Sequence, residues 1–113
     1  MLYDAANSLG DLDRLGLLRV TKLPQDLAWL DPVQIGLILE VADAGEQGMR
    51  ERKTQRFSED KRDAVRMLEL RDILYRERDR LGKPVFLCLT WKGQEALEVL
   101  RAIERNHAKD ATT

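Results

Sequence analysis

The stretch LTWKGQEALEVLRAIERN, residues 89–106, marks the point where a strand is expected to pass into a long helix. Thr90 is placed to act as the N-cap by accepting a backbone amide of the next turn, which contributes about 1 kcal/mol. Gly93, in the first turn, lets another part of the chain approach closely, and Trp91 is expected over the edge of the core. The stretch therefore predicts a strand-to-helix junction and not an active motif.

The segment before this junction, PVFLCLT at residues 84–90, is apolar at every position from 85 to 89. A strand that is apolar on both faces needs cover on both sides, and its backbone groups need a partner strand. The best partner is LLRVTKL, residues 17–23, where apolar and polar side chains alternate. The sequence thus predicts a small two-stranded sheet.

Three further segments are expected to be helical. Residues 31–45 have Asp31 as N-cap and Pro32 at the first helical position. Ser58 begins a second helix that runs to Leu81, and residues 4–15 form a short one. The second helix has a predicted inward stripe of Ala64, Met67, Leu68, Leu70, Leu74 and Leu81.

These elements predict one domain over residues 1–113 with a mainly α (α+β) fold of three to four helices and a small two-stranded sheet. Residues 46–57 hold glycine and charge without a sustained period, which indicates an exposed basic loop. Residues 108–113 are expected to fray as a C-terminal tail.

Composition narrows the class of protein. A chain of 113 residues buries about two-thirds of its unfolded surface, so a core can form without metals or disulfides. The single cysteine, Cys88, lies in an apolar run and fits a buried thiol in a reducing compartment. No signal peptide or membrane span is expected, and the predicted location is cytoplasmic.

The sequence carries no signature of an enzyme. Nucleophilic catalysis needs a positioned base, usually histidine, and the only one is His107 near the end of the chain. A zinc site needs about four nitrogen or sulfur ligands, and no glycine-rich phosphate loop is present. We expect a non-enzymatic protein without cofactor or metal.

Charge is unevenly distributed along the chain. Residues 1–49 hold 3 basic and 8 acidic side chains, whereas residues 50–83 hold 12 basic and 8 acidic ones. A basic segment neutralises phosphates by counterion release, with a strong dependence on salt and little dependence on nucleotide sequence. The predicted nucleic-acid or anion contacts are Arg50, Arg52, Lys53, Arg56, Lys61, Arg62 and Arg66. The alternative is that these charges only solvate a loop and the start of a helix.

The segment VFLCLTWKGQEALEVLRAI, residues 85–103, resembles the last strand and following helix of small winged-helix regulators. The variant Leu89, Thr90, Trp91, Gly93 is most similar to a family of small phage and prophage proteins of uncharacterised function. The resemblance implies a divergent winged helix, because the rest of the chain departs from the winged-helix pattern in two ways. Residues 46–57 separate two helices that should be joined by a short turn, and only one strand precedes the last helix where a wing has two.

Two functions remain open on the sequence. The first is a DNA-binding regulator from a phage or mobile element, with the basic segment on phosphates. The alternative is a protein-binding inhibitor or adaptor that docks on a host protein complex through its charged faces. Both include a possible homodimer with contacts from Leu97, Leu100 and Ile103, although this stripe can equally cover the chain's own core.

Overall fold

The computed structural model describes residues 23–112, with side chains as far as residue 105. A 3₁₀ turn, η1, precedes helices and strands in the order α3 (Pro32–Asp43), β1 (Met49–Arg50), α4 (Glu51–Thr54), α5 (Glu59–Leu70), β2 (Leu74–Arg78), β3 (Pro84–Leu89) and α6 (Trp91–Thr112). This architecture confirms the mainly α (α+β) class. The helix predicted over residues 4–15 and most of the strand predicted over 17–23 lie outside the described residues.

Helix α3 forms the centre of the core, as its sequence predicts. The Asp31 carboxylate accepts the backbone N–H of Gln34 at 2.8 Å, and the Gln34 side chain accepts the N–H of Asp31 at 2.9 Å. This reciprocal cap, followed by proline at the first helical position, fixes where the helix begins. Ile35, Leu37 and Ile38 are almost fully buried, so the helix is held by apolar packing as well as by its cap.

The sheet has three antiparallel strands in the order β1-β3-β2, with β3 in the middle. The two-stranded prediction is therefore wrong. Leu87 on β3 pairs with Met49 on β1, and Cys88 pairs with Tyr75 on β2. Strand β3 does need a partner, as predicted, but both of its edges are paired with segments that the sequence predicts to be a loop and a helix.

The helix predicted from Ser58 to Leu81 ends at Leu70. Its N-cap is confirmed, since the Ser58 hydroxyl accepts the Lys61 amide at 3.3 Å. Asp72 adopts a left-handed backbone with φ of 62°, which reverses the chain so that β2 can pair with β3. Leu74 is buried in the sheet instead of on a helix. The predicted inward positions Met67, Leu70 and Leu81 are exposed.

Residues 46–57 are not a loop throughout. Met49 in β1 is 1 % exposed and Thr54 in α4 is 6 % exposed, so this segment contributes to the core at two points. Thr54 also donates its hydroxyl hydrogen to the carbonyl oxygen of Glu51 at 2.7 Å. The basic side chains of the segment are consequently presented by a fixed strand and helical turn.

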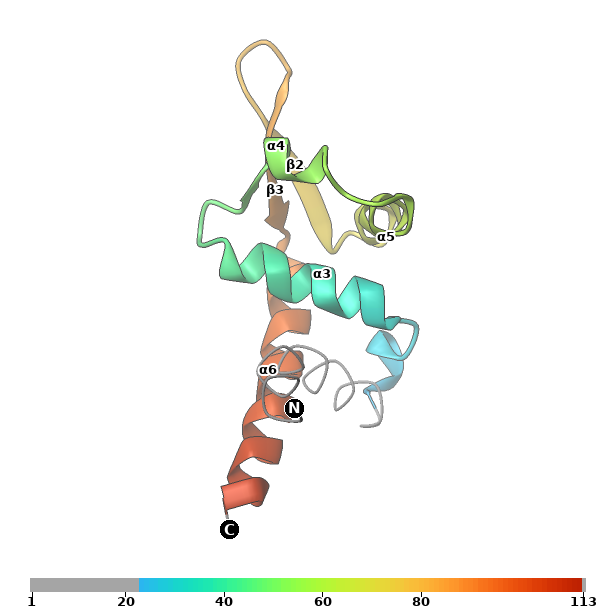
Figure 1. The fold of residues 1–113 in the computed structure, drawn as a ribbon, viewed down its shortest axis with the longest axis vertical. Helices are drawn as coiled ribbons and strands as arrows, with labels where there is room; N and C mark the ends of the chain where they lie inside the picture. Colours follow the sequence, from blue (N-terminus) through green and yellow to red (C-terminus); the bar gives the residue numbers. More distant parts are fainter. Residues whose placement is uncertain (1–22, 113) are drawn as a thin grey trace, which may run out of the picture.

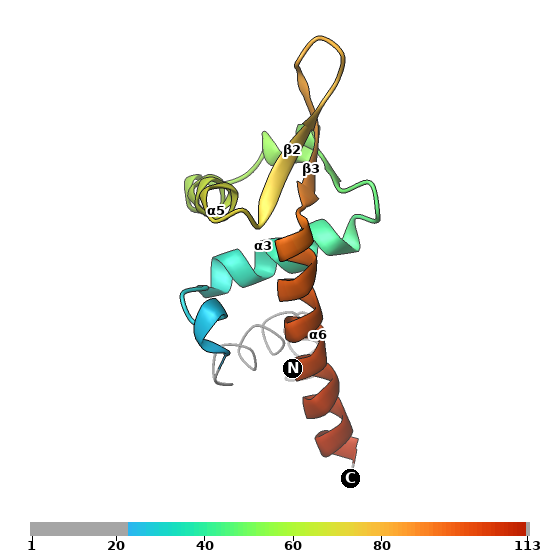
Figure 2. The ribbon, with the colours of Figure 1, turned by 180° about the vertical axis from the view of Figure 1, so that it is seen from behind.

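The junction between β3 and α6 agrees with the prediction. The Thr90 hydroxyl accepts the Gly93 amide at 2.9 Å, and a Cβ on Gly93 would collide with the carbonyl oxygen of Ile73. Figures 1 and 2 show α6 leading away from the sheet, while the β2–β3 hairpin projects at the opposite end of the molecule. Helices α4 and α5 lie toward the hairpin end, and α3 crosses between them and the outer half of α6.

Candidate nucleic-acid interface

Four of the predicted contact residues gather around α4. Arg50, Arg52, Lys53 and Arg56 are all exposed and line one surface hollow with a volume of ≈ 260 Å³. None of the four forms an ion pair with another residue in the part of the chain that the structure describes. We call these four residues the α4 cluster. Its positive charge is available to an anion from solution.

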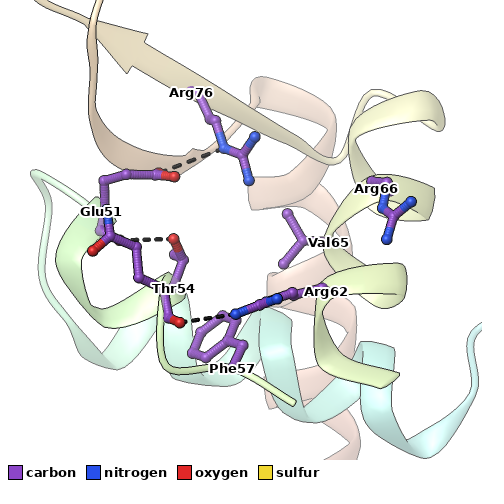
Figure 3. A pocket seen from close by; sticks show the side chains of 8 residues that line it. Glu51, Thr54, Phe57, Arg62, Val65, Arg66 and Arg76 are labelled. Carbon is purple, nitrogen blue, oxygen red and sulfur yellow. Dashed lines mark hydrogen bonds and ion pairs between the residues drawn. The ribbon is translucent and has the colours of Figure 1, made fainter. Parts of the chain in front are cut away.

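A second hollow, of ≈ 330 Å³, lies between α4, α5 and β2 (Figure 3). Its cationic lining is Arg62, Arg66 and Arg76. Arg62 donates from Nη2 to the carbonyl oxygen of Gln55 at 2.9 Å, which ties α5 to the segment after α4. Two predicted contacts, Arg62 and Arg66, are thus brought together here, beside an arginine that the sequence does not single out.

Arg76 connects three elements of this region. Its Nε lies 3.5 Å from Glu51 Oε2 on α4, and its Nη1 lies 3.7 Å from Glu69 Oε1 on α5. Figure 3 shows the Glu51 carboxylate and the Arg76 guanidinium meeting across the hollow. Because both carboxylates and the guanidinium are partly buried, the ion pairs help to fix α4 and α5 relative to the sheet.

Lys61, the remaining predicted contact, is engaged in an ion pair within the fold and is not part of the α4 cluster. Its Nζ lies 2.7 Å from Glu40 Oε2 on α3 and 4.5 Å from the centroid of the Phe57 ring. The lysine is therefore occupied in joining α5 to α3. It lies on the inner side of α5, so its charge is largely compensated within the fold.

The β2–β3 hairpin carries a further set of cations that lie outside the predicted contact set. Arg78, Arg80 and Lys83 lie at or beside its tip and are exposed. The Asp79 carboxylate accepts the backbone amides of Leu81 and Lys83, both at 2.9 Å. These bonds give the tip a defined shape. The signal was present as a short run, Leu74–Arg78, followed by a glycine turn at Gly82.

The outer face of α5 differs in character from the α4 cluster. Asp63, Arg66, Met67 and Leu70 occupy positions i, i+3, i+4 and i+7, so they share one side of the helix. Met67 is 45 % exposed and Leu70 is 81 % exposed, while Arg66 donates to the Asp63 carboxylate at 2.8 Å. This face therefore mixes apolar groups with a fixed ion pair.

The predicted dimer contacts are mostly internal. Leu97 is 4 % exposed and Leu100 is fully buried within one chain. Ile103 is half-buried and packs against the same core. The stripe on α6 therefore covers the chain's own hydrophobic core, and Leu97 and Leu100 offer no surface to a second copy.

Cys88 is a buried free thiol, as expected. It donates to the carbonyl oxygen of Gln47 at 3.2 Å. Burial raises the pKa of the Cys88 thiol, and the Glu77 carboxylate nearby acts in the same direction. The thiol consequently stays protonated at neutral pH, and a protonated thiol is a weak nucleophile.

Among the described residues, no group of three or more histidine, cysteine or acidic side chains is arranged to hold a metal ion. Within the same part of the chain, no helix combines the length and apolar character required to cross a bilayer.

Comparison of the chain with protein-family models, with curated proteins and with solved structures found no match. The resemblance of residues 85–103 to small winged-helix regulators therefore stays a prediction.

Proposed function

We propose that the chain is a non-enzymatic, cytoplasmic DNA-binding regulator of the winged-helix type, of the kind found in phages and mobile elements. The order α3, β1, α4, α5, β2, β3, with strands arranged β1-β3-β2, supports this proposal. Helices α4 and α5 would form the helix-turn-helix, with α5 as the helix that enters the major groove. The β2–β3 hairpin would be the wing.

Two features of the fold bring the chain nearer to the winged-helix pattern than its sequence suggests. Residues 46–57, which were expected to form a loop, contain the short strand β1 and the helix α4. A wing needs two strands, and β2 would be the second one. It lies in a segment that was expected to be the second half of a helix. A short turn, residues 55–58, then joins α4 to α5, as the helix-turn-helix requires.

The observation that carries the proposal is the α4 cluster beside the outward face of α5. Its four cations have no acidic partner among the described residues, whereas Lys61 and Arg66 each have one and Arg76 has two. An array of uncompensated cations is suited to the phosphates of a duplex, where binding releases condensed counterions. The hairpin tip adds Arg80 and Lys83 at the same end of the molecule (Figure 1).

The test is a fluorescence-anisotropy titration of the full chain with a labelled duplex at several salt concentrations. The variant changes Arg52, Lys53 and Arg56 together to alanine. If each cation neutralises one phosphate, the slope of log affinity against log salt becomes shallower by about 0.9 for each phosphate that is no longer neutralised. The expected change for the triple variant is therefore a slope reduction of about 2 to 3 and a clear decrease in affinity at low salt.

The matched control removes the same charge from α6, which leads away from the sheet (Figures 1 and 2). Lys92, Arg101 and Arg105 are exposed on α6, and their joint replacement by alanine is expected to leave the salt slope nearly unchanged. Equal decreases in the two triple variants would indicate a non-specific charge effect. Failure of the unaltered chain to bind duplex DNA at low salt would contradict the proposed function.

The alternative function is that of a protein-binding inhibitor or adaptor. It is supported by Trp91, which is 78 % exposed at the start of α6, because tryptophan is favoured at the centres of protein interfaces. A Trp91→Ala variant is expected to lose a partner that co-purifies with the unaltered chain from host lysate. Recovery of the unaltered chain alone under gentle salt would count against this function.

A further inference from the structure

We propose that the outward face of α5 reads base edges in the major groove, with Arg66 as the guanine-reading residue and Met67 as a contact for a thymine methyl group. This inference rests on the proposed function, because it requires that the chain bind duplex DNA. It goes beyond phosphate neutralisation, since it gives the chain a preference for particular base pairs.

The apolar residues on this face are the first reason. Met67 and Leu70 are exposed beside Arg66 on a helix that already buries Ala64, Val65 and Leu68 on its inner side. Phosphate groups gain nothing from apolar side chains. The major groove, in contrast, presents thymine methyl groups that apolar side chains contact favourably. The composition of the face therefore fits base edges better than it fits the DNA backbone.

The ion pair on this face is the second reason. Arg66 Nη2 donates to Asp63 Oδ1 at 2.8 Å, and the two side chains are 68 % and 61 % exposed. An arginine has five N–H donors, so one bond to Asp63 leaves enough donors for a bidentate contact to guanine O6 and N7. The carboxylate restricts the directions in which the guanidinium can point, and this makes Asp63 a positioning residue for Arg66.

The acidic residues of α5 are the third reason to expect contact with base edges. Glu59, Asp60 and Asp63 are exposed on the helix that carries Arg62 and Arg66, and their charges would repel phosphates. Carboxylates can accept hydrogen bonds from the exocyclic amino group of cytosine in the major groove. Interleaved acids are therefore a disadvantage for a backbone contact and are compatible with a helix that faces the bases.

The surroundings of α5 supply the backbone contacts that such a helix needs. The α4 cluster and the hairpin tip carry the uncompensated cations, and both belong to the elements next to α5 in the fold (Figures 1 and 2). A helix with its side chains is about 10–12 Å across, which matches a major groove about 12 Å wide. Phosphate contacts would set the position of the protein on the duplex, and α5 would provide the sequence preference.

The experiment begins with selection of preferred sites by the full chain from a pool of random duplexes. The selected duplex and an unrelated duplex of equal length are then titrated with the unaltered chain and with Arg66→Lys, which keeps the charge but removes the bidentate fork. We expect Arg66→Lys to weaken binding to the selected duplex by about 5- to 150-fold, the range for one bidentate base contact. Binding to the unrelated duplex should change by less than about 2-fold, because the charge is retained.

Three further variants test the roles of single residues. Arg101→Lys, on α6 and outside the proposed DNA-binding surface, is expected to bind both duplexes as the unaltered chain does. Met67→Ser is expected to lose preference at a thymine position of the selected site while keeping its affinity for the unrelated duplex. Asp63→Asn should reduce discrimination at the guanine read by Arg66, and it should leave the thymine preference intact.

The outcomes separate this inference from the proposed function. Salt-dependent binding with no enriched sequence, together with equal affinities for Arg66→Lys and the unaltered chain, would overturn base reading and leave DNA binding in place. Absence of any duplex binding would remove both proposals. In that case, loss of a co-purifying protein in Met67→Ser would assign the face to a protein partner.

Discussion

Gly93 lies where the first turn of α6 passes against the backbone of Ile73. A Cβ at this position would meet the Ile73 carbonyl oxygen and also the Leu89 side chain, at 3.1 Å. Neither the backbone of Ile73 nor the helix can move without disturbing the sheet, because the Thr90 amide donates to the same carbonyl at 3.0 Å. The glycine is therefore required by close packing and not by an unusual backbone angle.

Replacement of Gly93 by alanine is expected to lower the free energy of unfolding by about 1–3 kcal/mol, the usual cost of overpacking. The higher helix propensity of alanine offsets only part of this cost. Urea denaturation of the two proteins measures the difference. Gln94→Ala, at the exposed next position, is the control and should stay within about 0.5 kcal/mol. A Gly93→Ala protein as stable as the parent would contradict the close approach of the helix to Ile73.

Local signals were reliable at single residues that act on their immediate neighbours. Asp31, Ser58 and Thr90 are N-caps in the structure as predicted, because a cap depends on a few residues in sequence. The sequence did not indicate the partner of Lys61 or the exposure of Trp91. The partner of Lys61 is Glu40 on α3, and the exposure of Trp91 depends on how α6 leaves the sheet, so neither follows from local sequence.

At the scale of elements, the β2–β3 hairpin extends beyond the rest of the fold (Figure 1). Its exposed Arg80 and Lys83 form no ion pair with any residue in the described part of the chain. The joint replacement of both by alanine is expected to weaken duplex binding and to reduce the salt slope by about 2. The free energy of unfolding should stay within about 0.5 kcal/mol of the parent value.

The control for the hairpin variant is the double replacement of Arg101 and Arg105 by alanine on α6, which removes equal charge. Unchanged duplex affinity in the Arg80 and Lys83 variant would show that the hairpin is not a DNA contact. A large decrease in stability in that variant would mean that the tip charges support the fold, which would remove the basis for interpreting the titration.

The hairpin and α4 were the elements that the sequence prediction missed. Residues 71–81 hold four arginines, two leucines and one glutamate, which favour helices, and the helix α5 ends at Leu70 without a glycine or proline. β1 and α4 are only 2 and 4 residues long, too short to show a period. Their structure is imposed by pairing with β3 and by burial of Met49, which are tertiary effects.

At the scale of the whole molecule, the basic segment of the sequence is spread over neighbouring elements of the fold. Exposed cations without an acidic partner among the described residues lie on α4 and the hairpin, and also on α6, which leads away from the sheet (Figure 2). The sequence predicted the basic segment 50–83 but assigned it to one loop and one long helix. The structure divides the segment among α4, α5 and the hairpin.

The most direct measurement of this arrangement is NMR chemical-shift mapping of backbone amides during titration of the full chain with a short duplex. The account predicts salt-dependent shifts in α4, in the outward positions of α5 and at the tip of the β2–β3 hairpin, with little change in α3 or along α6. Shifts confined to α6, or no shifts at low salt, would contradict the assignment of α4, α5 and the hairpin as the DNA-binding surface.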